Sequence, residues 1–258
     1  MEKKQILAVD LGNSYVKIGC FINNELTEVK RVSWTDVLEN DPLKKEIEKQ
    51  EGIFSSVLSE GQNEAFKKRF PLLKQFDSGM ILPVSLNYAT PETLGKDRLC
   101  NAVGGWNQAE KKTNVLVVDV GTCIKLDVVT HDGIYQGGSI SPGIRLRYQS
   151  LNDYTANLPL ISETTQAELI GKSTKESMHS GVINGMQAEI NGLIARYEQK
   201  YESLTIFVTG GDAKYFDLET KNNMLKSLNA FRFLKLFPKF EVKFKRYVTI
   251  AYKQNTET

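Results

Sequence analysis

Two short segments of this chain combine an acidic residue, a glycine and a hydroxyl side chain directly after an apolar run. They are Asp10-Leu-Gly-Asn-Ser14 and Asp119-Val-Gly-Thr122. Glycine lets backbone N–H groups approach a phosphate, a hydroxyl adds a donor, and a carboxylate can hold a cation that offsets phosphate charge. One such turn is a weak signal, because Asp and Gly favour any tight turn. Since the combination occurs twice, the sequence predicts a nucleotide held by two related halves, with Gly210 and Gly211 close to its adenosine.

A third segment, Thr93-Leu-Gly-Lys-Asp-Arg98, places an acid beside an arginine after a glycine. A carboxylate can serve as a base, and arginine is the side chain best suited to bind a substrate that carries a carboxylate. The structural alternative is an Asp–Arg pair that caps a helix beginning near Leu99. The residues alone do not decide between these interpretations.

The elements expected to position these residues follow from hydrophobic patterning and turn residues. Both glycine turns join a buried strand to a returning strand, and each opens a unit of three strands. The chain therefore predicts two halves, residues 1–114 and 115–258, with a hairpin turn at His131-Asp-Gly133 and a break of the strand 134–140 at Gly137-Gly138. The other expected strands are 6–10, 16–21, 26–32, 53–57, 115–120, 124–130 and 204–208, and the expected helices are 36–50, 63–70, 99–112, 144–151 and 174–201.

Bulk composition excludes several classes of function. The chain has 258 residues, with 33 Lys and Arg against 31 Asp and Glu, so its charge balance favours neither a nucleic acid nor a membrane partner. Three cysteines and two histidines, widely spaced, predict reduced thiols and argue against a disulfide framework, a His-based metal site and a Ser-His-Asp triad. No apolar run approaches the roughly 20 residues of a membrane helix, and we expect a cytoplasmic protein.

Taken together, the motifs resemble those of the acetate and sugar kinase, heat-shock chaperone and actin superfamily, and within it type III pantothenate kinases. The resemblance implies an α/β fold of two ribonuclease H-like (actin-like ATPase) domains with a nucleotide cleft between them. The residues that carry it are Asp10-Leu-Gly-Asn-Ser14, Tyr88, Thr90-Pro-Glu-Thr-Leu-Gly-Lys-Asp-Arg98, Asp119-Val-Gly-Thr122, Gly137-Gly-Ser-Ile-Ser-Pro-Gly143, Ile170-Gly-Lys-Ser-Thr174 and Thr209-Gly-Gly-Asp212.

The resemblance also implies an activity, the ATP-dependent phosphorylation of pantothenate to 4′-phosphopantothenate, which is the first step of coenzyme A biosynthesis. Asp97 would be the general base, Asp10 would act on Mg²⁺ through water, and Asp119 would hold a monovalent cation, K⁺ or NH₄⁺. A homodimer is expected on the same ground. The implied pantothenate-binding residues are Tyr88, Gly95, Lys96, Asp97, Arg98 and Thr174, and the implied ATP-binding residues are Asp10, Leu11, Gly12, Asn13, Ser14, Tyr15, Val16, Lys17 and Thr122.

Several alternatives stay open at this point. Tyr88 could be a packing residue, and Thr174 could be a helix N-cap. Ser14 stands where the family usually has Thr, and Cys123 where it usually has Ala. The basic and aromatic segment 226–246 departs from the family; we favour an amphipathic strand there over a nucleic-acid surface. The competing functions are an accessory transcriptional regulator on the same fold and a kinase of another small hydroxy acid.

Overall fold

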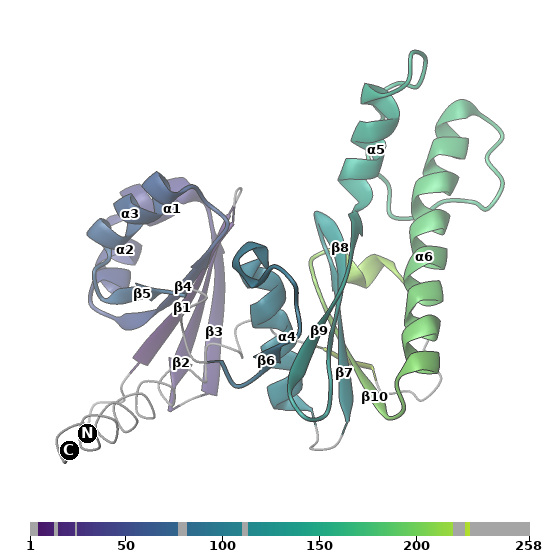
Figure 1. Cartoon of the computed structure of the whole chain (residues 1–258). Helices are drawn as coiled ribbons and strands as arrows, with labels where there is room; N and C mark the ends of the chain where they lie inside the picture. Colours follow the sequence, from purple (N-terminus) through teal and green to yellow (C-terminus); the bar gives the residue numbers. More distant parts are fainter. Residues whose placement is uncertain are drawn as a thin grey trace. The chain divides into compact units, whose positions relative to one another are not determined.

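The computed structural model describes residues 5–12, 15–23, 25–76, 82–109, 113–218 and 225–227. Their contacts divide the chain into two compact units (Figure 1). The first unit takes in the described residues up to Pro83 and Ala89–Gly104, and the second takes in Val84–Tyr88 and the described residues from Gly105 onward. The division near Asn114 and the nucleotide cleft between the halves remain predictions.

The first unit contains a five-stranded mixed sheet with the order β3-β2-β1-β4-β5. β1, β2 and β3 pair antiparallel, whereas β4 and β5 continue the sheet in parallel with β1. This confirms the predicted opening of three strands, and the strand order is that of a ribonuclease H-like domain. The strands are β1 (Gln5–Leu11), β2 (Val16–Ile22), β3 (Glu25–Val32), β4 (Glu51–Ser56) and β5 (Leu73–Gln75).

Helices α1 (Trp34–Glu39) and α2 (Asp41–Glu48) lie between β3 and β4 in the chain, and α3 (Glu60–Arg69) lies between β4 and β5. The single helix predicted over 36–50 is wrong. Asn40 ends α1 and caps α2 by accepting a hydrogen bond from the Leu43 N–H, and Pro42 occupies the first turn, where it needs no helical partner. Val37 and Ile47 pack in one buried cluster with Leu7, Val9 and Leu11 of β1.

The second unit contains a six-stranded sheet among the described residues, with the order β11-β10-β7-β8-β9-β6. The predicted break at Gly137-Gly138 is wrong, since β9 continues to Pro142. Instead, Gly137 adopts a positive φ of 83° beside a register shift in β8, so the strand bulges without ending. The strands are β6 (Ser85–Leu86), β7 (Asn114–Val120), β8 (Cys123–Val129), β9 (Ile134–Pro142), β10 (Leu204–Thr209) and β11 (Leu225–Ser227).

The central strand β7 is covered on both faces, which explains its continuous apolar sequence. Leu116, Val118 and Val120 belong to a buried cluster with side chains of α5 (Ile144–Asp153) and α6 (Thr174–Lys200). On the opposite face, Gly105 of α4 (Lys96–Gln108) lies directly against Val115 and Val117. Figure 1 shows α6 running along the sheet of this unit.

The helix predicted over 99–112 is found with a shifted start, whereas most of the strand predicted near the C-terminal end falls outside the described residues. Helix α4 begins at Lys96, three residues earlier than expected, so the Lys96-Asp-Arg98 segment forms its first turn instead of a loop. Short 3-10 turns at Pro91–Thr93 and Ala213–Tyr215 complete the described elements. The strand predicted within 226–246 lies outside the described residues, except for Lys226 and Ser227 of β11.

Candidate active site

The first glycine turn is built around Asp10, near the end of β1. Sheet register places Lys17 of β2 and Ser55 of β4 directly opposite Asp10 on its two sides. The Ser55 hydroxyl donates to Asp10 Oδ1 at 3.1 Å, and Lys17 Nζ lies 3.5 Å from Asp10 Oδ2. The Lys17 and Asp10 side chains are 53% and 35% exposed, so this carboxylate is oriented by neighbours and remains open to solvent.

The residues that follow Asp10 divide into backbone and side-chain roles. The Gly12 N–H donates to the Tyr15 carbonyl at 3.1 Å, and the Trp34 indole N–H donates to the Gly12 carbonyl at 3.1 Å. Leu11 and Val16 are fully buried core side chains, so they can offer a nucleotide only backbone groups. Tyr15 is exposed and lies under the Arg31 guanidinium. The predicted phosphate contacts of Asn13 and Ser14 fall on residues outside the described part of the chain.

Asp97 occupies the first turn of α4, where its charge is favoured by the exposed N–H groups of the helix end. Its carboxylate folds back over Gly95: a methyl group at residue 95 would approach Asp97 Oδ1 to 2.7 Å. Asp97 and Lys96 are partly exposed, whereas Arg98 is only 5% exposed and interacts within the protein. The sequence therefore places a reachable acid next to an arginine that the fold encloses.

Cys100, one turn further along α4, connects Asp97 to the first glycine turn. Burial raises the pKa of the Cys100 thiol well above its usual value, and the charges of Asp10 and Asp97 raise it further, while Lys96 opposes them. The charges of Asp10 and Asp97, which are far apart in sequence, therefore both act on the pKa of this one thiol.

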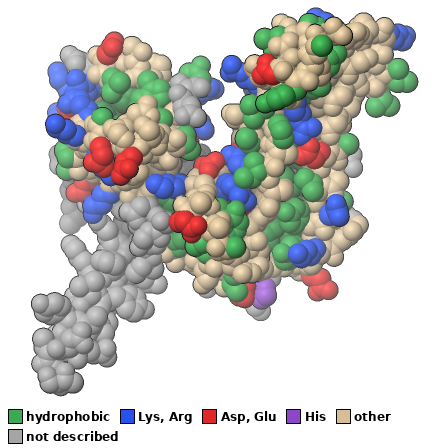
Figure 2. Space-filling model, turned by 45° about the horizontal axis from the view of Figure 1, so that its top comes forward, with side chains coloured by type: hydrophobic (Ala, Val, Ile, Leu, Met, Phe, Trp, Pro, Cys, Tyr) green, Lys and Arg blue, Asp and Glu red, His purple; other side chains and the backbone are tan. Residues whose placement is uncertain are grey.

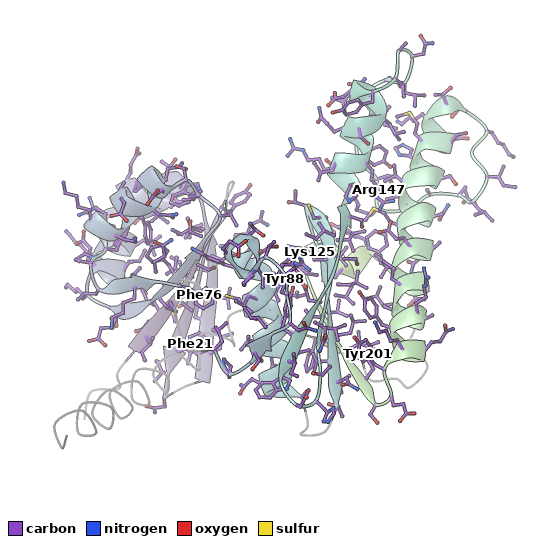
Figure 3. The ribbon with its side chains drawn as sticks, viewed as in Figure 1. Phe21, Phe76, Tyr88, Lys125, Arg147 and Tyr201 are labelled. Carbon is purple, nitrogen blue, oxygen red and sulfur yellow. The ribbon has the colours of Figure 1, made fainter. Side chains whose placement is uncertain are left out.

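The second glycine turn is built around Asp119 at the end of β7. Lys125 of β8 lies directly opposite it in the hairpin register, and the Lys125 Nζ–Asp119 Oδ2 distance is 2.8 Å (Figure 3). The Lys125 and Asp119 side chains are 17% and 15% exposed, so this ion pair is much less hydrated than the one at Asp10. Sequence analysis missed Lys125, although a lysine opposite an acid across a predicted hairpin was a signal that could have found it.

Two further loops converge on this second turn. The Gly143 N–H donates to the Thr122 carbonyl at 3.0 Å, and a methyl group at residue 143 would come within 2.0 Å of the Gly121 carbonyl oxygen. Gly210 has a φ of 99°, and the Asp212 N–H donates to the Val120 carbonyl at 3.0 Å. The segments at Gly143 and at Gly210 to Asp212 therefore meet the second turn at the end of β7, where Thr122 is exposed.

A partly buried ion pair that sequence analysis missed supports the Pro142-Gly143 loop. Arg147 of α5 pairs with Glu189 of α6, and its Nε donates to the Pro142 carbonyl at 2.8 Å. The Ser141 hydroxyl donates to the other oxygen of Glu189. No local motif predicts this ion pair, because Arg147 and Glu189 are 42 positions apart and meet only where α5 packs on α6.

The remaining predicted substrate residues lie in the second unit. The Tyr88 ring packs 5.9 Å from the Tyr135 ring, centroid to centroid, and over Gly137 (Figure 3). Thr174 is the exposed first residue of α6, and its alternative role as N-cap is wrong, because the Ser173 hydroxyl caps the helix by accepting from the Glu176 N–H at 3.2 Å. These contacts hold Tyr88 in place without assigning it a ligand.

The described residues limit which ions could bind. No group of three or more His, Cys, Asp or Glu side chains among them is arranged to hold a metal. Asp10 fits a magnesium ion that keeps its waters and is shared with substrate phosphates, since such sites need only one or two carboxylates. Asp119 does not fit a monovalent cation at Oδ2, because the Lys125 ammonium is already there.

Within the described ranges, no helix has both the length and the apolar character needed to cross a bilayer. On the face that Figure 2 shows, basic and acidic side chains are interspersed over both units.

Comparisons with known proteins identify the family. The family described as type III pantothenate kinase matches residues 6–196. The type III pantothenate kinase of Christiangramia forsetii is 42% identical over 227 residues, covering 86% of this chain and 93% of that protein. The enzyme of the same name from Flavobacterium johnsoniae is 38% identical over 234 residues, covering 87% and 93%.

One solved structure, MreB5 of Spiroplasma citri bound to ADP, aligns with a TM-score of 0.47 at 12% identity, covering 96% of this chain and 99% of that one. The family match, together with relatives well above 30% identity along most of their length, decides the assignment. The chain belongs to the type III pantothenate kinase family.

Proposed function

We propose that this pantothenate kinase uses the Asp97 carboxylate as the general base when the γ-phosphoryl group of ATP is transferred to the primary hydroxyl of pantothenate. The hydroxyl oxygen bonds to the γ-phosphorus, the bond from that phosphorus to the bridging oxygen of ADP breaks, and the hydroxyl proton passes to Asp97. The products are 4′-phosphopantothenate, the first intermediate of coenzyme A biosynthesis, and ADP.

One observation supports this role for Asp97 above the others. Its carboxylate is partly exposed, sits in the first turn of α4, and lies near the same thiol as Asp10. Gly95 makes room for this position, because any side chain there would strike Asp97 Oδ1. The helix N-terminus stabilises the charged form, which is the form that accepts a proton.

The glycine turns would bind the nucleotide phosphates. Backbone N–H groups at Asn13, Ser14 and Thr122 are the proposed donors, with the hydroxyls of Ser14 and Thr122 beside them, because the Gly12 N–H already donates to the Tyr15 carbonyl. Asp10 would orient a magnesium ion that offsets the charge of the transferring group, and Lys17 adds a cation on the same side. Phosphoryl transfer demands mainly such alignment and charge balance from a protein.

Several finer assignments remain proposals. Tyr88, Lys96, Arg98 and Thr174 are the proposed pantothenate contacts; the burial of Arg98 favours a role in supporting Lys96 and Asp97. A homodimer, a cytoplasmic location and the absence of a nucleic-acid partner also stay predictions. The resemblance predicts a monovalent cation at Asp119, and the Lys125 ion pair weighs against it, so no step here depends on that cation.

An ADP-release assay with purified protein tests the proposal. We expect ADP release to require pantothenate in preference to other small hydroxy acids, and the Asp97→Asn variant to lose about 10²-fold or more in kcat, the usual contribution of a positioned base. The matched control is Asp153→Asn, which changes an exposed carboxylate at the end of α5 that accepts hydrogen bonds from Gln149 of the same helix. Equal kcat values for Asp97→Asn and wild type would refute the role of Asp97.

A further inference from the structure

We infer that Lys125 is the built-in cation of the second phosphate turn, so that nucleotide binding by this chain does not depend on added K⁺ or NH₄⁺. The inference rests on the proposed function only in taking ATP as the ligand of that turn. It assigns Lys125 as a positioning residue that holds the charge of Asp119.

The geometry places an ammonium where a bound cation would otherwise be needed. Asp119 and Lys125 face each other across the hairpin that carries Gly121 and Thr122, and Lys125 Nζ is 2.8 Å from Asp119 Oδ2. The other carboxylate oxygen, Oδ1, faces Gly121, at 4.0 Å from the position that a methyl group there would take. The carboxylate is therefore joined to a fixed positive charge at the base of the turn.

Such a charge is necessary for phosphate to bind here. Asp119 is 15% exposed, and a carboxylate so shielded from water repels an incoming phosphate unless a positive charge offsets it. Lys125 supplies that charge from the neighbouring strand. Because its side chain is only 17% exposed, water competes little with Asp119 for the ammonium. The Gly121 N–H already donates to the Cys123 carbonyl, so the Thr122 N–H is the backbone donor that can meet a phosphate beside this neutral pair.

The surroundings leave little place for a free monovalent cation. An ion at Asp119 Oδ2 would lie beside the Lys125 ammonium, and like charges at that separation repel strongly in a poorly hydrated site.

The first turn contains the same device in a looser form. Lys17 stands opposite Asp10 as Lys125 stands opposite Asp119, but its Nζ–Oδ2 distance is 3.5 Å and both side chains are more exposed. The open pair at Asp10 leaves the carboxylate accessible to magnesium. In the closed pair, the Lys125 ammonium neutralises the Asp119 carboxylate at all times.

The direct test measures ATP affinity by calorimetry, with no pantothenate present, in choline chloride and in KCl at a matched ionic strength of about 0.1 M, which holds screening constant. Wild type should bind ATP with the same affinity in both salts, within about twofold. Lys125→Thr, which keeps a strand-compatible side chain, should bind about tenfold or more weakly in choline and recover in KCl or NH₄Cl. The double variant Lys125→Thr with Asp119→Asn should lose this salt rescue, because no carboxylate remains to hold the ion.

The controls keep the outcome unambiguous. Lys125→Arg retains the charge and should bind ATP equally in both salts. Lys30→Thr removes a lysine of β3 that pairs with Glu46 and Glu28 and with neither Asp10 nor Asp119 in an ion pair, and it should behave as wild type. Circular dichroism melting of each variant confirms that it is folded.

Two results would overturn the inference: a wild-type affinity for ATP that rises about tenfold on adding K⁺, or a folded Lys125→Thr variant that binds ATP normally in choline. Because these are binding measurements, they are independent of turnover. Loss of pantothenate-dependent ADP release would refute the proposed function and leave this result standing.

Discussion

The two glycine turns share one design and differ in how tightly it is closed. Each places an Asp at the end of a central strand and a Lys opposite it on the returning strand. The pair in the first unit is 3.5 Å long, and its Asp carboxylate receives a second hydrogen bond from Ser55. In the second unit the Nζ–Oδ2 distance is 2.8 Å, and both side chains are about one-sixth exposed. The loops that contain Gly143 and Gly210 also pack closely against this turn. Packing around each turn therefore decides whether its Asp–Lys pair is open to solvent or is held tightly within the fold.

The largest difference between the turns should appear when a methyl group is added. Gly143→Ala would force a carbon to 2.0 Å from the Gly121 carbonyl oxygen, whereas Gly12→Ala meets the Tyr15 carbonyl oxygen at 3.0 Å. We expect Gly143→Ala to lose about 3 kcal/mol or more of unfolding free energy, since backbone must move, and Gly12→Ala to lose about 1 kcal/mol. Urea unfolding followed by circular dichroism measures both changes.

Gly192→Ala in α6 is the control for this pair of substitutions, because nothing lies within 4 Å of the position that its methyl group would take. It should be neutral or stabilise the helix by about 0.5–1 kcal/mol. Equal destabilisation by Gly143→Ala and Gly12→Ala would contradict the idea that the second turn is the rigid one.

The ion pairs themselves should differ in stability. Lys125→Met leaves the shielded carboxylate of Asp119 without its counter-charge, and we expect a loss of about 3 kcal/mol. Lys17→Met removes a solvated partner of Asp10 and should cost less than about 1 kcal/mol. Urea midpoints of both variants in low and high salt give the comparison, and a larger loss for Lys17→Met would reverse it.

A smaller effect, on the KM for ATP, is expected when the Arg147–Glu189 ion pair beside the second turn is removed. Arg147→Gln removes the ion pair to Glu189 and the hydrogen bond to the Pro142 carbonyl, so the loop at Gly143 loosens. We expect the KM for ATP to rise about tenfold, corresponding to roughly 1.4 kcal/mol, with a smaller change in kcat. Arg145→Gln, two residues away and exposed, is the matched control. A change in kcat alone would argue against a positioning role.

The smallest effect concerns the cysteines near the two turns. Because burial and the nearby Asp10 and Asp97 charges raise the pKa of Cys100, less of its thiol is ionised at a given pH, and the thiolate is the reactive form. Iodoacetamide at mildly alkaline pH should therefore modify the partly exposed Cys123 before Cys100 or the buried Cys20. Mass spectrometry of the labelled peptides gives the order.

The same raised pKa has a consequence for stability. The folded state favours the neutral Cys100 thiol, so its contribution is complete below the unfolded pKa and declines as pH rises above that value. Early labelling of Cys100 in folded protein would contradict the burial on which both statements depend.

Much of the fold was predictable because strands of this chain carry strong local signals. The runs 6–10 and 115–120 are apolar on both faces and end in an acid and a glycine, and β1 and β7 form there. Where local signals competed, prediction was wrong. Asn40 looked like part of one helix and instead separates two, and Gly137-Gly138 looked like a strand end and instead forms a bulge.

By itself, the sequence determined which groups this protein has available: two glycine turns that each follow an acid, an acid beside an arginine, and a family likeness that the comparisons confirmed. These are local properties of residue type and spacing. Tertiary structure decided the rest, because it depends on neighbours distant in the chain. Strand register set Lys125 against Asp119, helix packing brought Glu189 to Arg147, and burial enclosed Arg98 while leaving Asp97 accessible. Charge and burial act through space, and only the folded chain specifies which groups they join.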